Sequence, residues 1–164
     1  MTTNAKHELI FEDLRNIALI NPPKELNADT LYVISGYTSA NYAKQHLDEL
    51  TIENNLGVTV NLLIGMRDDL DEVKKIAYCD LEKTYGNQFR AYCVDDGPNV
   101  HSKMYAWFLG NTPVIGFAGS ANYSEYGFPN KMTKQRNQLT EANPIEIKEY
   151  FTQLLENSIP VQEK

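Results

Sequence analysis

Apolar and polar residues follow one another along the first part of the chain in a pattern that predicts strands and helices in turn. Two short apolar runs, rich in β-branched residues, end at Gly36 and Gly65, which is typical of buried strands. Apolar residues at helical spacing follow each run and predict amphipathic helices. The predicted strands are Thr30–Ser35, Val58–Ile64 and Phe89–Val94, and the predicted helices are Ser39–Leu50 and Asp69–Tyr85. Strands separated by helices indicate an α/β layer fold with parallel pairing.

The second part of the chain is richer in strands. Residues 110–113 have turn chemistry and join two predicted strands, so we expect a hairpin that makes the sheet mixed. The predicted elements here are the strands Val100–Leu109, Val114–Gly119 and Gln138–Thr140 and the closing helix Ile145–Leu155, while Pro22 and Pro23 predict a loop near the start. These elements together predict one α/β domain over residues 1–156, with helices flanking a mixed sheet.

The two ends of the chain and its cysteines indicate its context. Residues 157–164 contain a proline and a charged end, a composition that resembles a linker to a further domain. Met1–His7 is polar and no apolar segment follows it, so no signal peptide is expected, and no apolar run is long enough to cross a bilayer. Cys79 and Cys93 lack the spacing of metal ligands and are expected to be reduced thiols. We therefore expect a cytoplasmic protein.

The charge of the chain is unevenly distributed. The formal net charge is -7, which by itself argues against a nucleic-acid-binding protein. Between Gly97 and Thr140, however, the charged residues are Lys103, Lys131, Lys134 and Arg136 against Glu125. A locally basic surface of this kind could contact the phosphates of DNA.

His101 and Lys103 are the first candidates for chemistry. They lie two residues apart in a predicted strand, which would place both side chains on one face of the sheet. A lysine can neutralise a phosphate oxygen while a neutral imidazole attacks the phosphorus or moves a proton. The pair alone is weak evidence, because such spacing also occurs by chance on solvated strands. With three histidines, and with His46 expected on the solvated edge of its helix, no zinc site and no cofactor are expected.

A second and a third segment strengthen the argument for phosphate chemistry. Gly119-Ser120-Ala121-Asn122 ends a predicted buried strand, so that its hydroxyl and amide could bind phosphate oxygens, although a turn with Asn122 as a helix cap has the same pattern. Downstream, Glu141 could orient the imidazole and favour its charged form, or it could be an ordinary surface acid.

Taken together, the three segments resemble the HxK, GSxN and downstream glutamate motifs of the phospholipase D superfamily. The resemblance implies a three-layer α/β domain and a metal-independent phosphodiesterase. It also implies that His101 is a nucleophile that forms a phosphohistidine, that Lys103, Ser120 and Asn122 bind the phosphate, and that Glu141 partners the histidine. Glu125 is the competing candidate for this last role. Phe108 stands where the full pattern of the superfamily has an aspartate.

Two longer segments look like the nuclease branch of this superfamily. Thr30–Ala40 and Val114–Phe128 are similar to the corresponding parts of NgoFVII-type restriction endonucleases. Those proteins join an N-terminal phospholipase D-like domain to a C-terminal DNA-reading domain. The resemblance therefore implies DNA as substrate and a linked DNA-recognition domain.

The motif occurs once in the chain. Members of the superfamily with one motif form a twofold dimer, because two histidines are needed at one phosphate, one as nucleophile and one as general acid. We therefore expect a homodimer with the active site at the interface, and no membrane partner. Two alternatives remain, namely a hydrolase of lipids or other small phosphodiesters, and a non-catalytic dimerisation or binding module of the same fold.

Overall fold

The computed structural model describes residues 8–129 and 136–164. These residues form a seven-stranded sheet with the order β6-β5-β4-β1-β2-β3-β7. The strands are β1 (Thr30–Ser35), β2 (Thr59–Ile64), β3 (Phe89–Val94), β4 (Lys103–Leu109), β5 (Thr112–Gly119), β6 (Leu139–Ala142) and β7 (Ser158–Pro160). The α-helices are α1 (Asn21–Glu25), α2 (Ala40–Asp48), α3 (Glu72–Tyr85) and α4 (Pro144–Leu155).

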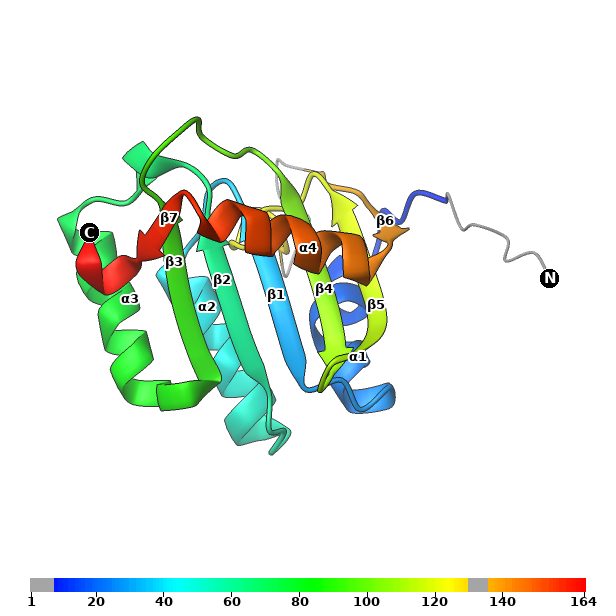
Figure 1. Ribbon diagram of the computed structural model, residues 1–164. Helices are drawn as coiled ribbons and strands as arrows, with labels where there is room; N and C mark the ends of the chain where they lie inside the picture. The colour runs from blue at the N-terminus through cyan, green and yellow to red at the C-terminus, as the bar shows by residue number, and fades with distance from the viewer. Residues whose placement is uncertain (1–7, 130–135) are drawn as a thin grey trace.

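Helices cover both faces of the sheet, so the expected three-layer arrangement is confirmed. In Figure 1, α4 crosses the front of the sheet, while α1, α2 and α3 lie behind it. Three of the helices begin at a residue whose side chain caps the first turn. The side chains of Ser39, Asp71 and Asn143 each accept a hydrogen bond from a backbone N–H in the first turn of α2, α3 and α4 respectively.

The pairing of the strands is mixed, as the sequence predicted. β1, β2 and β3 are parallel neighbours, whereas β4 runs antiparallel to both β1 and β5. In this arrangement the carboxyl ends of β1, β2, β3 and β5 meet the amino end of β4 at one edge of the sheet. We call this edge the upper edge, as it is drawn in Figure 1.

Two apolar cores lie on the two faces of the sheet. The larger core lies between the sheet and α1, α2 and α3 and includes Trp107, Tyr105 and Phe117, all nearly or fully buried. The smaller core lies under α4 and includes Ile34, Phe108 and Phe151. Phe108, at the position of the superfamily's aspartate, is 2% exposed and packs edge-on against Tyr32, so it has become a core residue.

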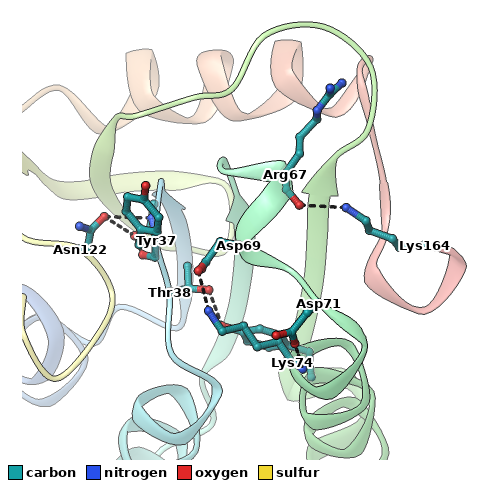
Figure 2. A network of polar contacts seen from close by, with 10 residues as sticks. Tyr37, Thr38, Arg67, Asp69, Asp71, Lys74, Asn122 and Lys164 are labelled. Atoms are coloured by element: carbon teal, nitrogen blue, oxygen red, sulfur yellow. Dashed lines mark hydrogen bonds and ion pairs between the residues drawn. The ribbon is translucent and has the colours of Figure 1, made fainter.

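Two expectations for the ends of the domain were wrong. Pro22 and Pro23 form the first turn of α1 and not a loop, because proline fits where a helical N–H has no partner within the helix. Residues 157–164 are not a linker within the structure, since β7 pairs with β3 and Val161 is fully buried. Lys164 also donates from its Nζ to the Arg67 carbonyl oxygen at 3.0 Å (Figure 2).

Candidate active site

His101 lies at the upper edge of the sheet, in the loop that leads into β4. The predicted strand was too long at this end, because β4 begins at Lys103 and His101 precedes it. The face of His101 is therefore set by the loop and not by strand periodicity. The side chain is exposed, which a nucleophile that meets a large substrate requires.

The loop before His101 is held by close contacts with the ends of the central strands. The Val100 N–H donates to the Gly65 carbonyl oxygen at 2.9 Å. A Cβ at Gly65 would lie 2.1 Å from the Val100 carbonyl oxygen, so only glycine allows this approach. A Cβ at Gly36 would lie 3.4 Å from the His101 Cα. Gly36 and Gly65, which directly follow β1 and β2, thus allow the histidine loop to pack against the ends of these strands.

Arg67 holds the same loop from the side. Its backbone N–H donates to Asn99 Oδ1 at 2.9 Å, and its guanidinium donates to the carbonyl oxygens of Asp95 and Gly97 at 3.0 and 3.2 Å. These contacts leave the loop little freedom, so His101 has a defined place before any substrate arrives.

Lys103 is the first residue of β4 and lies opposite Ser35, the last residue of β1. Its ammonium donates to the His101 carbonyl oxygen at 2.7 Å. The cation thus lies close to the backbone of His101, and it retains further protons for an anion.

Asn122 lies beside the same strand end and is held in one orientation. Its Oδ1 accepts hydrogen bonds from Ser35 Oγ and from the Tyr37 N–H, both at 3.2 Å (Figure 2). A backbone N–H can only donate, so the oxygen of the amide must face Tyr37. The NH₂ group consequently faces away from both donors, where it can donate to a phosphate oxygen.

Ser35 is a supporting residue that the sequence reasoning missed. Its side chain is fully buried, and its single proton is shared between the Tyr37 carbonyl oxygen at 2.6 Å and Asn122 Oδ1 at 3.2 Å. Its Oγ also accepts from the Tyr123 N–H at 3.0 Å. A hydroxyl that ends an otherwise apolar strand was the available signal, but the contacts with Asn122 and Tyr123 come from residues far along the chain.

Ser120 is held by the segment that enters β6. Its Oγ accepts from the Gln138 N–H at 3.0 Å and donates to Asn137 Oδ1 at 3.2 Å. The Asn137 amide donates in turn to the carbonyl oxygens of Tyr126 and Gly127, at 2.8 and 3.2 Å. Asn137, which the sequence reasoning also missed, therefore links Ser120 to the turn that follows Asn122.

The two candidate acids lie in different places. Glu141 is exposed on β6 opposite Phe117, while Leu139 lies opposite Gly119 at the upper edge. Glu141 therefore lies two residues, or about 7 Å, further down the sheet, and on a strand separated from β4 by β5. The structure does not bring Glu141 to the histidine loop.

Glu125 lies in the turn after Asn122, beside the start of α2. It accepts a hydrogen bond from the Asn41 side chain at 3.2 Å. Partial burial acts to raise the pKa of Glu125, but hydrogen bonds from Ser39, its own backbone and Asn41 outweigh it and lower the pKa below its ordinary value. Within the described residues, neither acid hydrogen-bonds to His101, and the choice of acidic partner stays a prediction.

His46 is not solvated, contrary to expectation. Its Nδ1 lies 2.6 Å from the Tyr123 hydroxyl and its Nε2 lies 3.0 Å from the Leu19 carbonyl oxygen, and the side chain is fully buried. A carbonyl oxygen can only accept, so Nε2 carries the proton and Nδ1 accepts from Tyr123. Burial lowers the pKa of His46 to about 4. His46 therefore holds the side chain of Tyr123, the residue that follows Asn122.

The remaining residues singled out in the sequence are aromatic or basic. Tyr105 and Trp107 are fully buried and hydrogen-bond to backbone oxygens, so they belong to the core. Arg136 is exposed, while Lys131 and Lys134 lie outside the described residues. No group of three potential metal ligands occurs in residues 8–129 and 136–164. Over the same residues, no helix has the length and apolar character to span a membrane.

The fold and the site together define a phospholipase D-type phosphodiesterase domain. The HxK and GSxN segments meet at one edge of the mixed sheet, where Ser35 lies opposite Lys103 in register and hydrogen-bonds to Asn122. The chain belongs to the family described as the NgoFVII restriction endonuclease N-terminal PLD domain, whose model matches residues 12–164. It is thus an enzyme domain of the nuclease class of phosphodiesterases.

Three solved structures share the fold. NucT from Helicobacter pylori has a TM-score of 0.59 at 15% identity, over 93% of this chain and 97% of that chain. Polyphosphate kinase from Porphyromonas gingivalis has a TM-score of 0.55 at 13% identity, over 97% of this chain and 24% of that chain. Phosphatidylserine synthase from Haemophilus influenzae has a TM-score of 0.55 at 13% identity, over 87% of this chain and 36% of that chain. A sequence search of curated proteins found no match.

Proposed function

We propose that this domain cleaves DNA without a metal ion, as the catalytic part of a restriction endonuclease, through a phosphohistidine at His101. The observation that carries the proposal is the arrangement around the end of β1. Lys103 lies opposite Ser35, and Ser35 holds the Asn122 amide with its NH₂ group directed outward. A cation and an oriented amide donor at the same edge of the sheet as an exposed histidine supply what a phosphoryl transition state needs.

The reaction would proceed in two displacements. A neutral ring nitrogen of His101 attacks phosphorus, a P–N bond forms, and the P–O bond to one nucleoside breaks. Lys103 and Asn122 stabilise the charge on the non-bridging oxygens. Water then attacks the phosphohistidine, the P–N bond breaks, and the histidine leaves as the product phosphate monoester forms. In this scheme the Ser120 hydroxyl, which donates to Asn137, contributes by holding the loop or by turning toward the phosphate when substrate binds.

The leaving oxygen needs a proton, and a second histidine must supply it. One motif per chain means that this group would come from a second copy, so we propose a twofold dimer with both copies of His101 at the interface. His101 is exposed at the upper edge, which allows the two sites to face each other. Sequence recognition would fall to a linked DNA-reading domain, in a protein of the cytoplasm.

Plasmid cleavage in excess EDTA tests the proposal. Wild type and His101→Ala would be compared, together with Lys103→Ala and its charge-matched control Lys24→Ala, since Lys24 is exposed on α1, which Figure 1 shows away from the upper edge. We expect cleavage by wild type and Lys24→Ala, and loss of cleavage in the two site variants. Activity that EDTA abolishes would refute metal independence. Turnover of phosphatidylcholine liposomes without cleavage of DNA would favour the lipid alternative.

A further inference from the structure

A pocket of about 230 Å³ opens beside His101, under the loop that precedes β4. His101 itself forms part of its wall. The other walls include Asp96, Pro98, Asn99, Tyr150, Leu154 and Asn157, from the histidine loop and the carboxyl end of α4. The pocket therefore lies on the α4 side of the sheet edge.

The phosphate-binding groups lie on the other side of the same edge. Lys103 alternates with Met104, and Met104 packs against the core under α4, so the Lys103 side chain belongs to the opposite face. Ser35 and Asn122 share that face with Lys103. His101 thus lies between a phosphate-binding side and the pocket.

The chemistry of the pocket does not suit a phosphate. Asp96 is one of the lining residues, and its negative charge beside the pocket would repel an anion. Pro98, Leu154 and Tyr150 contribute apolar groups to the lining, and Asn99 and Asn157 contribute polar groups. This combination fits a flat, uncharged group with polar edges.

The pocket is formed in advance of binding. The backbone N–H groups of Asp95 and Asp96 donate to the Asn157 carbonyl oxygen at 2.9 and 3.1 Å, which ties the loop to the end of α4. Asn99 Oδ1 is occupied by the Arg67 N–H at 2.9 Å, which turns the NH₂ group of Asn99 away from Arg67. Asp96 and Asn157 are further polar residues of the lining.

We propose that this pocket binds one nucleobase next to the scissile phosphate. The proposal rests on the proposed function and names the form of its substrate. Pockets for drug-sized ligands begin at about 300 Å³, so a pocket of about 230 Å³ suits a single base. A base inside it has left the stack, which favours single-stranded or locally opened DNA. Carboxylate and amide groups accept hydrogen bonds from the exocyclic amines of cytosine, adenine and guanine, so these bases are preferred over thymine, which has no such amine.

Filling the pocket tests the proposal. Asn157→Phe in the full chain places a ring in the cavity and keeps the backbone contacts of residue 157. Gln153→Phe is the matched control, because Gln153 is an exposed residue of α4 that does not line this pocket. The substrates are a single-stranded oligonucleotide and bis(p-nitrophenyl) phosphate, which has no base.

We expect Asn157→Phe to lower the ratio of kcat/KM on the oligonucleotide to kcat/KM on bis(p-nitrophenyl) phosphate about tenfold or more, while Gln153→Phe leaves the ratio unchanged. A wild-type preference for amine-bearing bases (cytosine, adenine and guanine) over thymine beside the cleaved bond, weakened in Asp96→Ala, would support the assignment of the lining residues. An unchanged ratio in Asn157→Phe would overturn the proposal. Equal losses on both substrates with a change in oligomeric state would assign the pocket to the dimer interface and overturn it too.

Failure of the proposed function can be told apart from failure of the pocket. If wild type hydrolyses neither substrate, the proposed function is wrong, and the binding of a fluorescent single-stranded oligonucleotide then decides the question of the pocket. An increase in Kd of about tenfold in Asn157→Phe would support base binding, and the same Kd in both proteins would refute it.

Discussion

The substitution Ser35→Ala tests whether Ser35 orients Asn122 for catalysis or only stabilises the fold. The hydroxyl contacts the Tyr37 carbonyl oxygen, Asn122 Oδ1 and the Tyr123 N–H, and it is fully buried. Ser35→Ala leaves the Tyr123 N–H without this acceptor in a buried place. The expected cost is about 1–3 kcal/mol in the free energy of unfolding, which corresponds to a decrease in Tm of roughly 2–10 °C for a chain of this size.

The effect on catalysis follows from Asn122. Its Oδ1 loses one of two donors and keeps the Tyr37 N–H at 3.2 Å. Complete removal of a transition-state donor costs about 10²–10³ in kcat. A donor that keeps half of its support should lose less, so we expect a decrease in kcat of about tenfold, or about 1.4 kcal/mol. The assay is turnover of bis(p-nitrophenyl) phosphate in EDTA, beside thermal unfolding of the same preparations.

Two comparisons make this reasoning refutable. Tyr78→Phe removes another fully buried hydroxyl, one that bonds to Thr38, so it should destabilise the fold by a similar amount and spare kcat. The double variant Ser35→Ala with Asn122→Ala should be no less active than Asn122→Ala alone, because Ser35 acts through Asn122. Additive losses in the double variant, or an equal loss of kcat in Tyr78→Phe, would show that Ser35 matters only for stability.

Three further predictions concern the surroundings of the site. Burial lowers the pKa of His46 from 6.5 to about 4, so between pH 6.5 and 4 the unfolded chain binds more protons than the folded chain, and wild type should lose about 3 kcal/mol of stability over that range. In urea unfolding, the stability of His46→Gln should depend less steeply on pH, and an equal slope in both proteins would contradict this. Gly65→Ala should displace the Val100 loop, with a stability loss of about 1–3 kcal/mol and loss of turnover, whereas Gly57→Ala, whose Cβ would meet nothing within 4 Å, should be normal in both assays. Asn122→Asp keeps the acceptor for both of its donors but adds a negative charge, so inhibition by inorganic phosphate should weaken about tenfold or more; unchanged inhibition would remove Asn122 from the anion site.

The histidine loop shows where the local pattern of apolar residues stops predicting the structure. Short apolar runs and alternation predicted β1, β2 and β3 with nearly correct bounds, because one face of each strand is fully buried while the other face is only partly covered, and that difference is visible in consecutive residues. At Val100–Ser102 the same reasoning failed. Val100 contacts Gly65, a residue distant in sequence, so Val100–Ser102 lie outside β4, which begins only at Lys103.

The two candidate acids show what the order of motifs along the chain cannot predict. Motif order places Glu141 downstream of Asn122, but order along the chain says nothing about how far along its strand a residue comes to lie. The register of β6 against β5 decides that, and it puts Leu139, not Glu141, at the upper edge.

Periodicity and motif spacing are properties of neighbouring residues, so the amino-acid sequence was sufficient to predict the class of fold, the order of its main elements and the segments that carry chemistry. Only the folded chain shows that Ser35 and Asn137 support the motif, that His46 is buried against Tyr123, and that the last residues complete the sheet. Each of these depends on hydrogen bonds between segments that meet only when the strands pair, and no local pattern contains that information.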